Sequence, residues 1–435
     1  MTNPSGVSQL GTAVTGGQRD RATGGAARAA ASPRLRGDLA GAALLIAPLA
    51  AFMVVFFVVP IAMLLVHAVW DPSVAAAFPR TARALAGWSE RGLPPPRVFA
   101  AAAADIIAAD AQGTLGPASQ RLDQDLPGMS VVLMRTRFHL ENPAASAPTS
   151  GKPAVRHEMI SIDSRWANPS TWKVIARDVH PLTSAYMLHA VDLAQLPDGK
   201  IVPQPSDQGV YLRILGRTFG ISAVVTIIVV LLGYPLAYWL AQLPERRQRA
   251  AMLAVLVPFW TSILVRIAAW MVVLSREGIV NKLAESLHLI DHPLTLIYNR
   301  AGVIISMVQI LIPFMVLPLF AVMRGIPPSF RRAAISLGSH PFGAFWRVYL
   351  PQTIPGVVAG ALLVFISALG YYIAPALLGG AGDQMLSYYI AYYTNTLIDW
   401  GLAAALSALL LGATALLFAV YAMLAASRRA MVGGA

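Results

Sequence analysis

The amino-acid sequence predicts an all-α polytopic membrane protein with six transmembrane helices. Of its 435 residues, 56% are hydrophobic and only 12% are charged, whereas a soluble domain carries roughly a quarter charged residues. The mean hydropathy is +0.60. Six apolar runs each reach the length of about 20 residues that a helix needs to cross a bilayer. We therefore expect most of the chain to be embedded in a membrane.

The chain begins with a polar tail and a first membrane span. Residues 1–38 are rich in Gly, Ala, Thr and Arg and show no periodicity, so we expect a disordered tail. The apolar run over 39–70 is the predicted transmembrane helix 1. Because this run is longer than the hydrophobic region of a signal peptide, we expect it to remain as a membrane anchor.

A polar insert over 71–209 separates helix 1 from the next span. The insert carries 13 basic and 13 acidic residues, so it is neutral overall. Short helical patterns alternate in it with Pro- and Gly-rich turns, and a segment of this length is able to bury a small core. We expect a mainly helical subdomain on the periplasmic, or external, side.

The remaining part of the chain, over 211–426, holds the other five predicted helices. They cover residues 215–242, 250–274, 301–323, 355–378 and 401–426. Several of these runs contain proline. Membrane helices tolerate internal proline because neighbouring groups satisfy the carbonyls that lose their hydrogen bonds.

The distribution of positive charge predicts the orientation of the helices. With the N-terminus inside, the cytoplasmic pieces hold 14 Arg and three acidic residues, whereas the external loops over 275–300 and 379–400 hold three basic and five acidic residues. This is the positive-inside asymmetry. It places both termini, including the tail 427–435, in the cytoplasm. It also accounts for the net charge of +12 without nucleic-acid binding.

The sequence shows no pattern of catalytic or metal-binding residues. There is no Cys, so neither a thiolate metal site nor a Cys nucleophile is available. The insert has four scattered histidines without ligand spacing, and we find neither a Ser-His-Asp signature nor a G-x-x-x-x-G-K phosphate loop. We expect a non-catalytic protein without a metal site.

The cytoplasmic loop over 324–354 carries the signals of a short helix. Pro327 and Pro328 suit its first turn, and Ser329 suits a helix cap. Gly338 suits the position just after the helix, and Pro341 is expected to stop further helix.

This predicted helix has one narrow apolar face beside two basic residues. The face consists of Phe330, Ala333, Ala334 and Leu337, with Arg331 and Arg332 next to it. Such a helix is suited to docking on a partner protein. The alternative is a helix that lies in the lipid interface with its arginines on phosphate groups.

The same loop resembles the EAA loop of ABC-importer permeases. In that family Glu-Ala-Ala is followed by three residues and Gly, then by nine residues and Ile-x-Leu-Pro. Here Ala333-Ala334 and Gly338 match, and nine residues later comes Val348-Tyr349-Leu350-Pro351. The stretches 216–241, 257–270 and 365–380 are similar to the spermidine/putrescine-type permeases within the type I importers. The resemblance extends over residues 211–426.

The resemblance implies a type I ABC importer permease fold and a set of partners. The chain would pair with a second permease subunit, a paralogue, and would dock on two ATPase subunits that bind ATP and Mg²⁺. An external solute-binding protein would deliver the substrate. No cofactor would be bound by this chain, and membrane lipid would surround it. The coupling to the ATPase would run through Arg331, Arg332, Ala333, Ala334, Leu337, Gly338, Val348, Leu350 and Pro351.

One residue departs from the family pattern. Arg332 stands where the family has its acidic first residue. Either the ATPase carries a compensating acidic residue, or docking depends on the packing of the small apolar residues of the loop.

Aromatic and acidic residues are the candidates for the substrate pathway. The segment 370–400 holds six Tyr, one Trp and two Asp, without Lys or Arg. A cation–π contact contributes roughly 0.5–2 kcal/mol, so Tyr371, Tyr372, Asp383 and Asp399 are candidates to contact an organic cation. The alternative is an aromatic belt that anchors the spans at the interface.

Arg266 is the only charged residue well inside a predicted span, and Trp260 and Trp270 flank it. Charges within a membrane usually face the bundle interior or a water-filled cavity. Arg266 either holds a carboxylate or a helix C-terminus, or it acts as a gate or an anion site. The last of these roles would argue against a cationic substrate.

The sequence thus predicts an inner-membrane permease subunit of an ATP-driven importer for spermidine, putrescine or a related small organic cation. A type I permease for another solute, such as an amino acid, an anion or Fe(III), is the first alternative. A secondary transporter would need ionisable residues in several spans. A membrane enzyme or sensor would need a convergent catalytic set in the insert.

Overall fold

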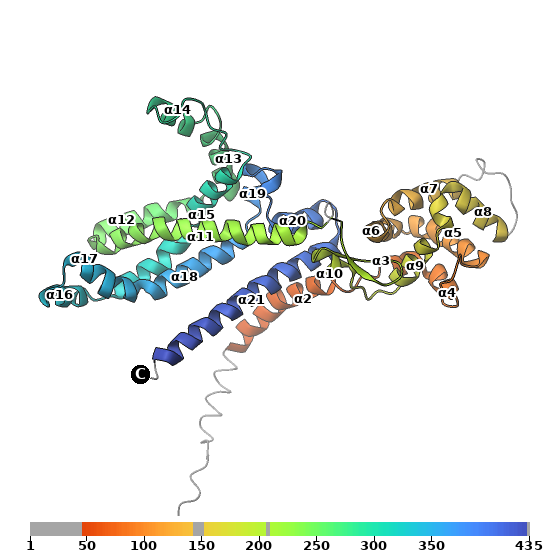
Figure 1. Cartoon of the computed structure of the whole chain (residues 1–435), viewed down its shortest axis with the longest axis horizontal. Coiled ribbons are helices and arrows are strands. Elements are labelled where there is room, and N and C mark those ends of the chain that lie inside the picture. Colours follow the sequence, from red (N-terminus) through yellow and green to blue (C-terminus); the bar gives the residue numbers. More distant parts are fainter. Residues whose placement is uncertain (1–45, 142–151, 206–208, 433–435) are drawn as a thin grey trace, which may run out of the picture. The chain divides into compact units, whose positions relative to one another are not determined.

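The computed structural model describes residues 46–141, 152–205 and 209–432, with the side chains of 152–154 and 424–432 left out (Figure 1). The predicted disordered tail 1–38, the start of predicted helix 1 and the end of the tail 427–435 lie outside these residues. The described chain is mostly helical.

Five described helices are long and apolar enough to cross a membrane. They are Ile46–Val66, Tyr211–Gln242, Arg300–Gly325, Pro341–Leu369 and Trp400–Met423. A bent pair, Glu245–Trp260 with Ile263–Val273, makes a sixth crossing if the two parts count as one span. The prediction of an all-α polytopic protein is confirmed. The described residues have six crossings when the bent pair is counted as one span.

The prediction of one continuous helix over 250–274 is wrong. The structure has α12 (Glu245–Leu256), a 3₁₀ turn η4 (Val257–Trp260) and α13 (Ile263–Val273), and the two parts are bent by 96°. Pro258 cannot donate a backbone hydrogen bond and clashes with the preceding turn. The hydroxyl of Thr261 then donates to the carbonyl of Pro258 at 2.8 Å, which ends the first part.

The predicted span 355–378 begins and ends elsewhere. A continuous helical run starts with α17 (Pro341–Ala344), passes through the π-helical turn η5 (Phe345–Tyr349) and ends with α18 (Leu350–Leu369). Pro341 therefore starts a helix instead of only stopping one, since proline fits the first helical turn. The run ends at Gly370, and α19 (Ile373–Leu378) is a separate short helix.

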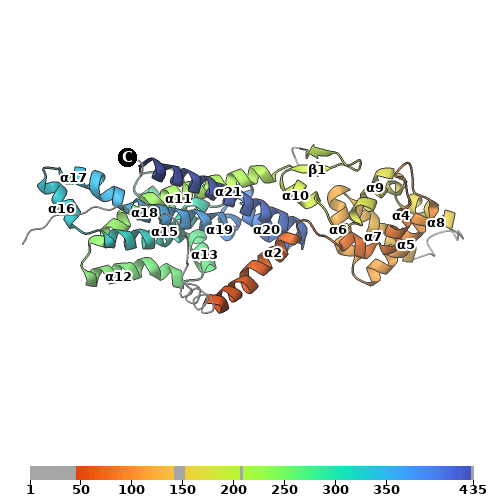
Figure 2. The ribbon, with the colours of Figure 1, turned by 90° about the horizontal axis from the view of Figure 1, so that it is seen from below.

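The helices α11 (Tyr211–Gln242), α15 (Arg300–Gly325) and α18 pack against one another as a bundle (Figures 1 and 2). Glycine allows close approach at their crossings: a Cβ on Gly233 would lie 2.9 Å from Cγ of Met315, and a Cβ on Gly360 would lie 2.5 Å from its Sδ. Small residues at helix contacts are typical of membrane bundles.

The other elements of the membrane part are α2 (Val59–Val66) after the π-helical turn η1 (Val54–Val58), α14 (Ile279–Ser286), α16 (Ser329–Ser336), η6 (Ala381–Asp383), α20 (Leu386–Asn395) and the long helix α21 (Trp400–Val432).

The insert folds around its own hydrophobic core. Its elements are α3 (Ser73–Ala77), α4 (Pro79–Leu85), α5 (Pro96–Ala111), α6 (Leu115–Asp125), α7 (Met129–Glu141), α8 (Lys152–Ile162), η3 (Ser164–Ala167), α9 (Pro169–Asp178), α10 (Ala185–Ala190) and the antiparallel strands β1 (Leu193–Gln195) and β2 (Ile201–Pro203). Trp166 and Trp172 are fully buried. The indole of Trp166 donates to the hydroxyl of Thr136 at 2.9 Å, and that of Trp172 donates to the carbonyl of Trp166 at 3.0 Å.

Candidate functional site

The short helix predicted in the loop 324–354 is α16. Its N-cap is Pro328 without a side-chain hydrogen bond, so the prediction that Ser329 caps it is wrong: Ser329 is its first helical residue. Gly338 has a φ of 91°. The amide of Gly338 donates to the carbonyl of Ile335 at 2.9 Å, and that of Ser339 donates to Ala334 at 3.0 Å. These two bonds form a Schellman motif, for which glycine is the preferred residue.

The apolar residues of α16 face away from the rest of the described chain. Leu337 is 89% exposed and Phe330 is 52% exposed. Further along, Phe342 and Trp346 are 67% and 52% exposed. The exposed aromatic and aliphatic side chains form a surface suited to a protein partner.

The two neighbouring arginines of α16 point to different environments. Arg331 donates to the hydroxyl of Tyr238 in α11 at 3.2 Å, so it ties α16 to the bundle. Arg332 and Ala333 are exposed, and Ala334 is half-buried. Arg332, the residue that departs from the family pattern, is thus free to contact a partner.

The second half of the predicted motif lies where the loop joins the bundle. Val348 and Leu350 are half-buried and Pro351 is exposed. Tyr349 packs on Tyr238, with ring centroids 5.5 Å apart. These residues belong to the helical run that becomes α18, so α16 lies directly before a helix of the bundle in the chain.

The structure brings two of the predicted pathway residues, Arg266 and Tyr371, near one another, and Trp270 lies one helical turn after Arg266 in α13. In α13, the indole of Trp270 donates to the side-chain carbonyl of Gln309 in α15 at 3.2 Å. Tyr371 lies near enough to the Arg266 guanidinium for an electrostatic interaction. Nε of Arg266 is buried and has no hydrogen-bond partner in the described part of the chain.

The other predicted pathway residues do not join this group. Trp260 and Tyr372 are 75% and 41% exposed. Asp383 forms an ion pair with Arg300, with 2.9 Å between Oδ1 and Nε. Arg217 donates to the carbonyls on both sides of this aspartate, those of Gly382 and Gln384. Asp383 is therefore held by positive charges of its own chain.

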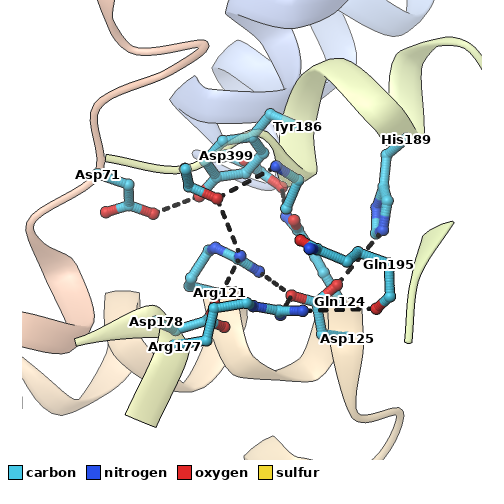
Figure 3. Close-up of polar contacts among 12 residues, drawn as sticks. Asp71, Arg121, Gln124, Asp125, Arg177, Asp178, Tyr186, His189, Gln195 and Asp399 are labelled. Atoms are coloured by element: carbon cyan, nitrogen blue, oxygen red, sulfur yellow. Dashed lines mark hydrogen bonds and ion pairs between the residues drawn. The ribbon is translucent and has the colours of Figure 1, made fainter. Parts of the chain in front are cut away.

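Asp399 lies beside the insert, just before α21. It accepts hydrogen bonds from the amide of Leu402, at 3.0 Å, and from the side chain of Gln124 in α6. Nearby, the hydroxyl of Tyr186 donates to Asp71. The ring of Tyr186 lies against the backbone of Gly401, where a Cβ would come within 2.2 Å of it. Figure 3 shows these side chains together.

A buried ionic network in the insert supports this junction (Figure 3). Arg121 contacts Asp125 at 2.8 Å and Asp178 at 3.2 Å. Arg177 contacts Asp178 at 2.8 Å and also Asp125, and His189 lies 3.5 Å from Asp125. The guanidinium of Arg121 also lies over the Tyr186 ring, 5.3 Å from its centroid. The network therefore fixes the side chain that packs on Gly401.

Burial and charge set the pKa values of the carboxyl groups in this region. Burial alone would raise the pKa of Asp125, but the hydrogen bond to His189 and the charges of Arg121 and Arg177 hold it below its usual value. Burial raises the pKa of Asp178. Burial also raises the pKa of Asp399, and the negative charge of Asp71 adds to that rise.

Sequence reasoning did not find this network. Tyr186 and Asp71 are 115 residues apart, and Gln124 and Asp399 are 275 residues apart. The acidic and aromatic composition of 370–400 made Asp399 a candidate pathway residue. Nothing in the local sequence indicated that Arg121 lies near it in space.

Comparisons with known proteins give a consistent result. Residues 204–430 match the family described as binding-protein-dependent transport system inner membrane component. The chain is 34% identical over 211 residues to the spermidine/putrescine transport system permease protein PotB of Escherichia coli (strain K12), covering 48% of this chain and 77% of that protein. The identity to PotB of Salmonella typhimurium (strain LT2) is also 34%, covering 48% and 74% of the two chains.

Two further similarities are weaker. The molybdenum transport system permease protein ModB of Mycobacterium bovis is 28% identical over 196 residues, covering 45% of this chain and 72% of that protein. A solved structure of a bacterial ABC transporter involved in the import of the acidic polysaccharide alginate covers 50% of this chain and 79% of its own, at 18% identity and a TM-score of 0.40.

Proposed function

This chain belongs to the family of binding-protein-dependent transport system inner membrane components, and we propose that, as the multi-pass permease subunit of an ABC importer, it carries a polyamine such as spermidine or putrescine. The observation that carries the proposal is the 34% identity over 211 residues to polyamine permeases. No covalent bond of the substrate is broken by this chain, and ATP is hydrolysed on separate ATPase subunits.

The chemistry of the segment 370–400 supports a cationic substrate. Tyr388 and Tyr392 stack with ring centroids 6.2 Å apart, and aromatic faces attract organic cations. Asp399 lies in the same segment and has no ion pair in the described structure, whereas Asp383 is already paired with Arg300.

A second candidate substrate class is an anion. Arg266 is the observation that favours it, because its buried Nε has no partner in the described part of the chain, and a related permease is named for molybdenum transport. An anion held at Arg266, Trp270 and Tyr371 would make these residues a pathway site. With a polyamine as substrate, Arg266 has a structural role.

The mechanism that we propose links ATP to substrate movement through α16. Two ATPase subunits close on ATP, and the exposed face of α16 (Phe330, Ala333, Leu337) follows the ATPase surface. The motion passes through Arg331 and Tyr238 to α11, and through the helical run 341–369 to α18. Rocking of the bundle then opens the pathway alternately to the two sides.

The proposed assembly has both termini and the loop 324–354 in the cytoplasm and the insert outside, in agreement with the distribution of Arg. A second permease, a paralogue, completes the pathway. An external solute-binding protein delivers the substrate.

Substitution of Gly338 tests the coupling role of α16. We expect Gly338→Asp to abolish uptake of radiolabelled spermidine in proteoliposomes that contain the complete transporter, while membrane insertion stays normal. The φ of 91° disfavours a side chain, and a carboxylate at a helix C-terminus is unfavourable. Gly325→Asp is the matched control, since a Cβ at Gly325 meets no described atom within 4 Å. Undiminished uptake by Gly338→Asp would contradict the coupling role.

Ligand binding by the cognate solute-binding protein tests the substrate. We expect calorimetry to detect tight binding of putrescine or spermidine. Amino acids, sulfate and Fe(III) are the comparison ligands, and tight binding of one of these instead would exclude the polyamine assignment.

A further inference from the structure

Two cavities lie between the insert and the start of α21. The first has a volume of about 160 Å³, and Asp71, Trp70, Tyr186 and Trp400 are among the residues that line it. The second has a volume of about 480 Å³, and Asp123, Tyr211 and Tyr393 are among its lining residues. Gln120, Gln124 and Asp399 line both cavities. The two cavities therefore share a wall.

The cavities carry an excess of negative charge. Asp71 accepts from the amide of Ser73 and the hydroxyl of Tyr186. Asp123 accepts from the amide and hydroxyl of Ser130, both at 3.0 Å. Asp399 accepts from Gln124 and the amide of Leu402. These donors are all neutral groups, so the hydrogen bonds do not cancel the negative charge of the three carboxylates. Arg121 lies near enough to Asp399 for an electrostatic interaction, but among the described residues it makes no ion pair with it.

The cations near the cavities are already paired. Arg121 lines the first cavity, but its guanidinium contacts Asp125 at 2.8 Å and Asp178 at 3.2 Å. In the described ranges, Asp125 and Asp178 form ion pairs with Arg or His nitrogens at 4.0 Å or less. Asp71, Asp123 and Asp399 have no Lys, Arg or His nitrogen of the described ranges within that distance. A bound cation would compensate the three free carboxylates.

Two polar atoms at the first cavity also lack partners. Oε1 of Gln124 and Oγ of Ser73 are buried without a hydrogen bond in the described structure. Both residues line the first cavity. An unsatisfied buried acceptor costs roughly 1–3 kcal/mol, and an ammonium group is a donor that would satisfy it.

The arrangement favours an extended organic cation over a metal ion. Asp71 lines only the first cavity, Asp123 lines only the second, and Asp399 lines both. The negative charges are therefore spread along the two cavities. In the described part of the chain, no group of three or more His, Cys, Asp or Glu is arranged to hold a metal. The rings of Trp70 and Trp400, each about half exposed, supply faces for cation–π contacts.

We propose that these two cavities form a binding site for a linear polyamine between the insert and the permease. The site rests on the proposed polyamine function. Arg266 is not among the residues that line it, and the bundle contributes only Tyr211, the first residue of α11, to its lining. It would hold the substrate beside the segment 370–400, where substrate from a solute-binding protein would arrive.

The test is calorimetric titration of spermidine into the full chain in lipid nanodiscs, without its ATPase or binding protein. We expect saturable binding by the wild type. Asp399→Asn is expected to weaken it by about tenfold or more, as for the loss of a charge-assisted hydrogen bond. Asparagine keeps the cap on the amide of Leu402, because it is as good an N-cap as aspartate. Asp123→Asn provides a second variant in the other cavity, with the same expected direction.

Asp198→Asn is the matched control. The substitution, which lies in the insert, removes one negative charge, as Asp399→Asn and Asp123→Asn do. The only ion pair of Asp198 in the described structure is an exposed contact with Lys200 at 3.7 Å. We expect its spermidine affinity to equal that of the wild type.

The outcomes separate the site from the proposed function when uptake by the complete transporter is measured in parallel. Spermidine uptake together with no saturable binding, or with equal losses in Asp399→Asn and Asp198→Asn, would overturn the site and leave the function standing. Binding that depends on Asp399 and Asp123, but no spermidine uptake, would support the site and overturn the function.

Discussion

The insert and the bundle of α11, α15 and α18 both have buried cores, but different interactions fill them. The insert buries large rings, with Trp166 and Trp172 fully covered, and an ion pair between Arg121 and Asp178 whose side chains are 2% and 1% exposed. At the centre of the bundle, helices approach where Gly233 and Gly360 meet Met315.

In the proposed assembly the insert lies in water and the bundle lies in lipid, and the difference follows from these two solvents. A domain that folds in water gains from removing rings from water, and this gain offsets the desolvation of a buried ion pair that is fully hydrogen-bonded. In lipid, apolar side chains gain nothing by leaving an apolar solvent, so helices associate through close packing of small residues. We therefore expect charge removal to damage the insert and added volume to damage the bundle.

The largest effect is expected for Arg121→Met. This change leaves Asp125 and Asp178 buried with less compensation, and breaking a buried pair costs about 3–5 kcal/mol. Pulse proteolysis of the detergent-solubilised chain in a urea series measures the loss of stability. Lys200→Met is the control, because its contact with Asp198 spans 3.7 Å and the two side chains are 77% and 50% exposed; an exposed pair contributes about 0–1 kcal/mol. Equal losses in the two variants would contradict a structural role of the network.

A smaller effect is expected for Gly233→Leu in the bundle. A side chain there meets Cγ of Met315 at 2.9 Å, and overpacking costs about 1–3 kcal/mol. Thermal unfolding in detergent measures the change. Gly220→Leu on the same helix is the control, since its Cβ has no described atom within 4 Å. If both variants unfold at the wild-type temperature, glycine packing does not hold the bundle together.

The smallest effect is expected for Arg332→Ala in α16. Its side chain is exposed, so the change in stability should stay within about 0.5 kcal/mol. We expect uptake to be largely retained because the proposed docking depends on Ala333 and Leu337. Arg331→Ala should lower uptake more, since it removes the 3.2 Å bond to Tyr238. A greater loss of uptake in Arg332→Ala would indicate an acidic partner residue on the ATPase.

The sequence was informative where the signal is local. Hydropathy located the spans. Gly338, which directly follows the last residue of the apolar face, predicted the end of α16. The predicted helix bounds failed at Pro258, which lies in the break of the predicted helix 250–274, and at Pro341, which begins a helix. Proline is compatible with either a helix break or a helix start. Only the packing of neighbouring elements decides between these outcomes.

The sequence by itself determined the membrane class, the helical character of the insert and the position of the short helix α16, because each depends on composition or on residues within a few turns of one another. The tertiary structure alone decided that Asp399 faces Gln124 and the insert, that Asp383 is paired with Arg300, and that Arg266 lies near Tyr371. Contacts between residues that are 83 or 275 positions apart leave no periodic signal in one sequence. The three-dimensional fold therefore had to show which of the charged residues are neutralised and which remain free.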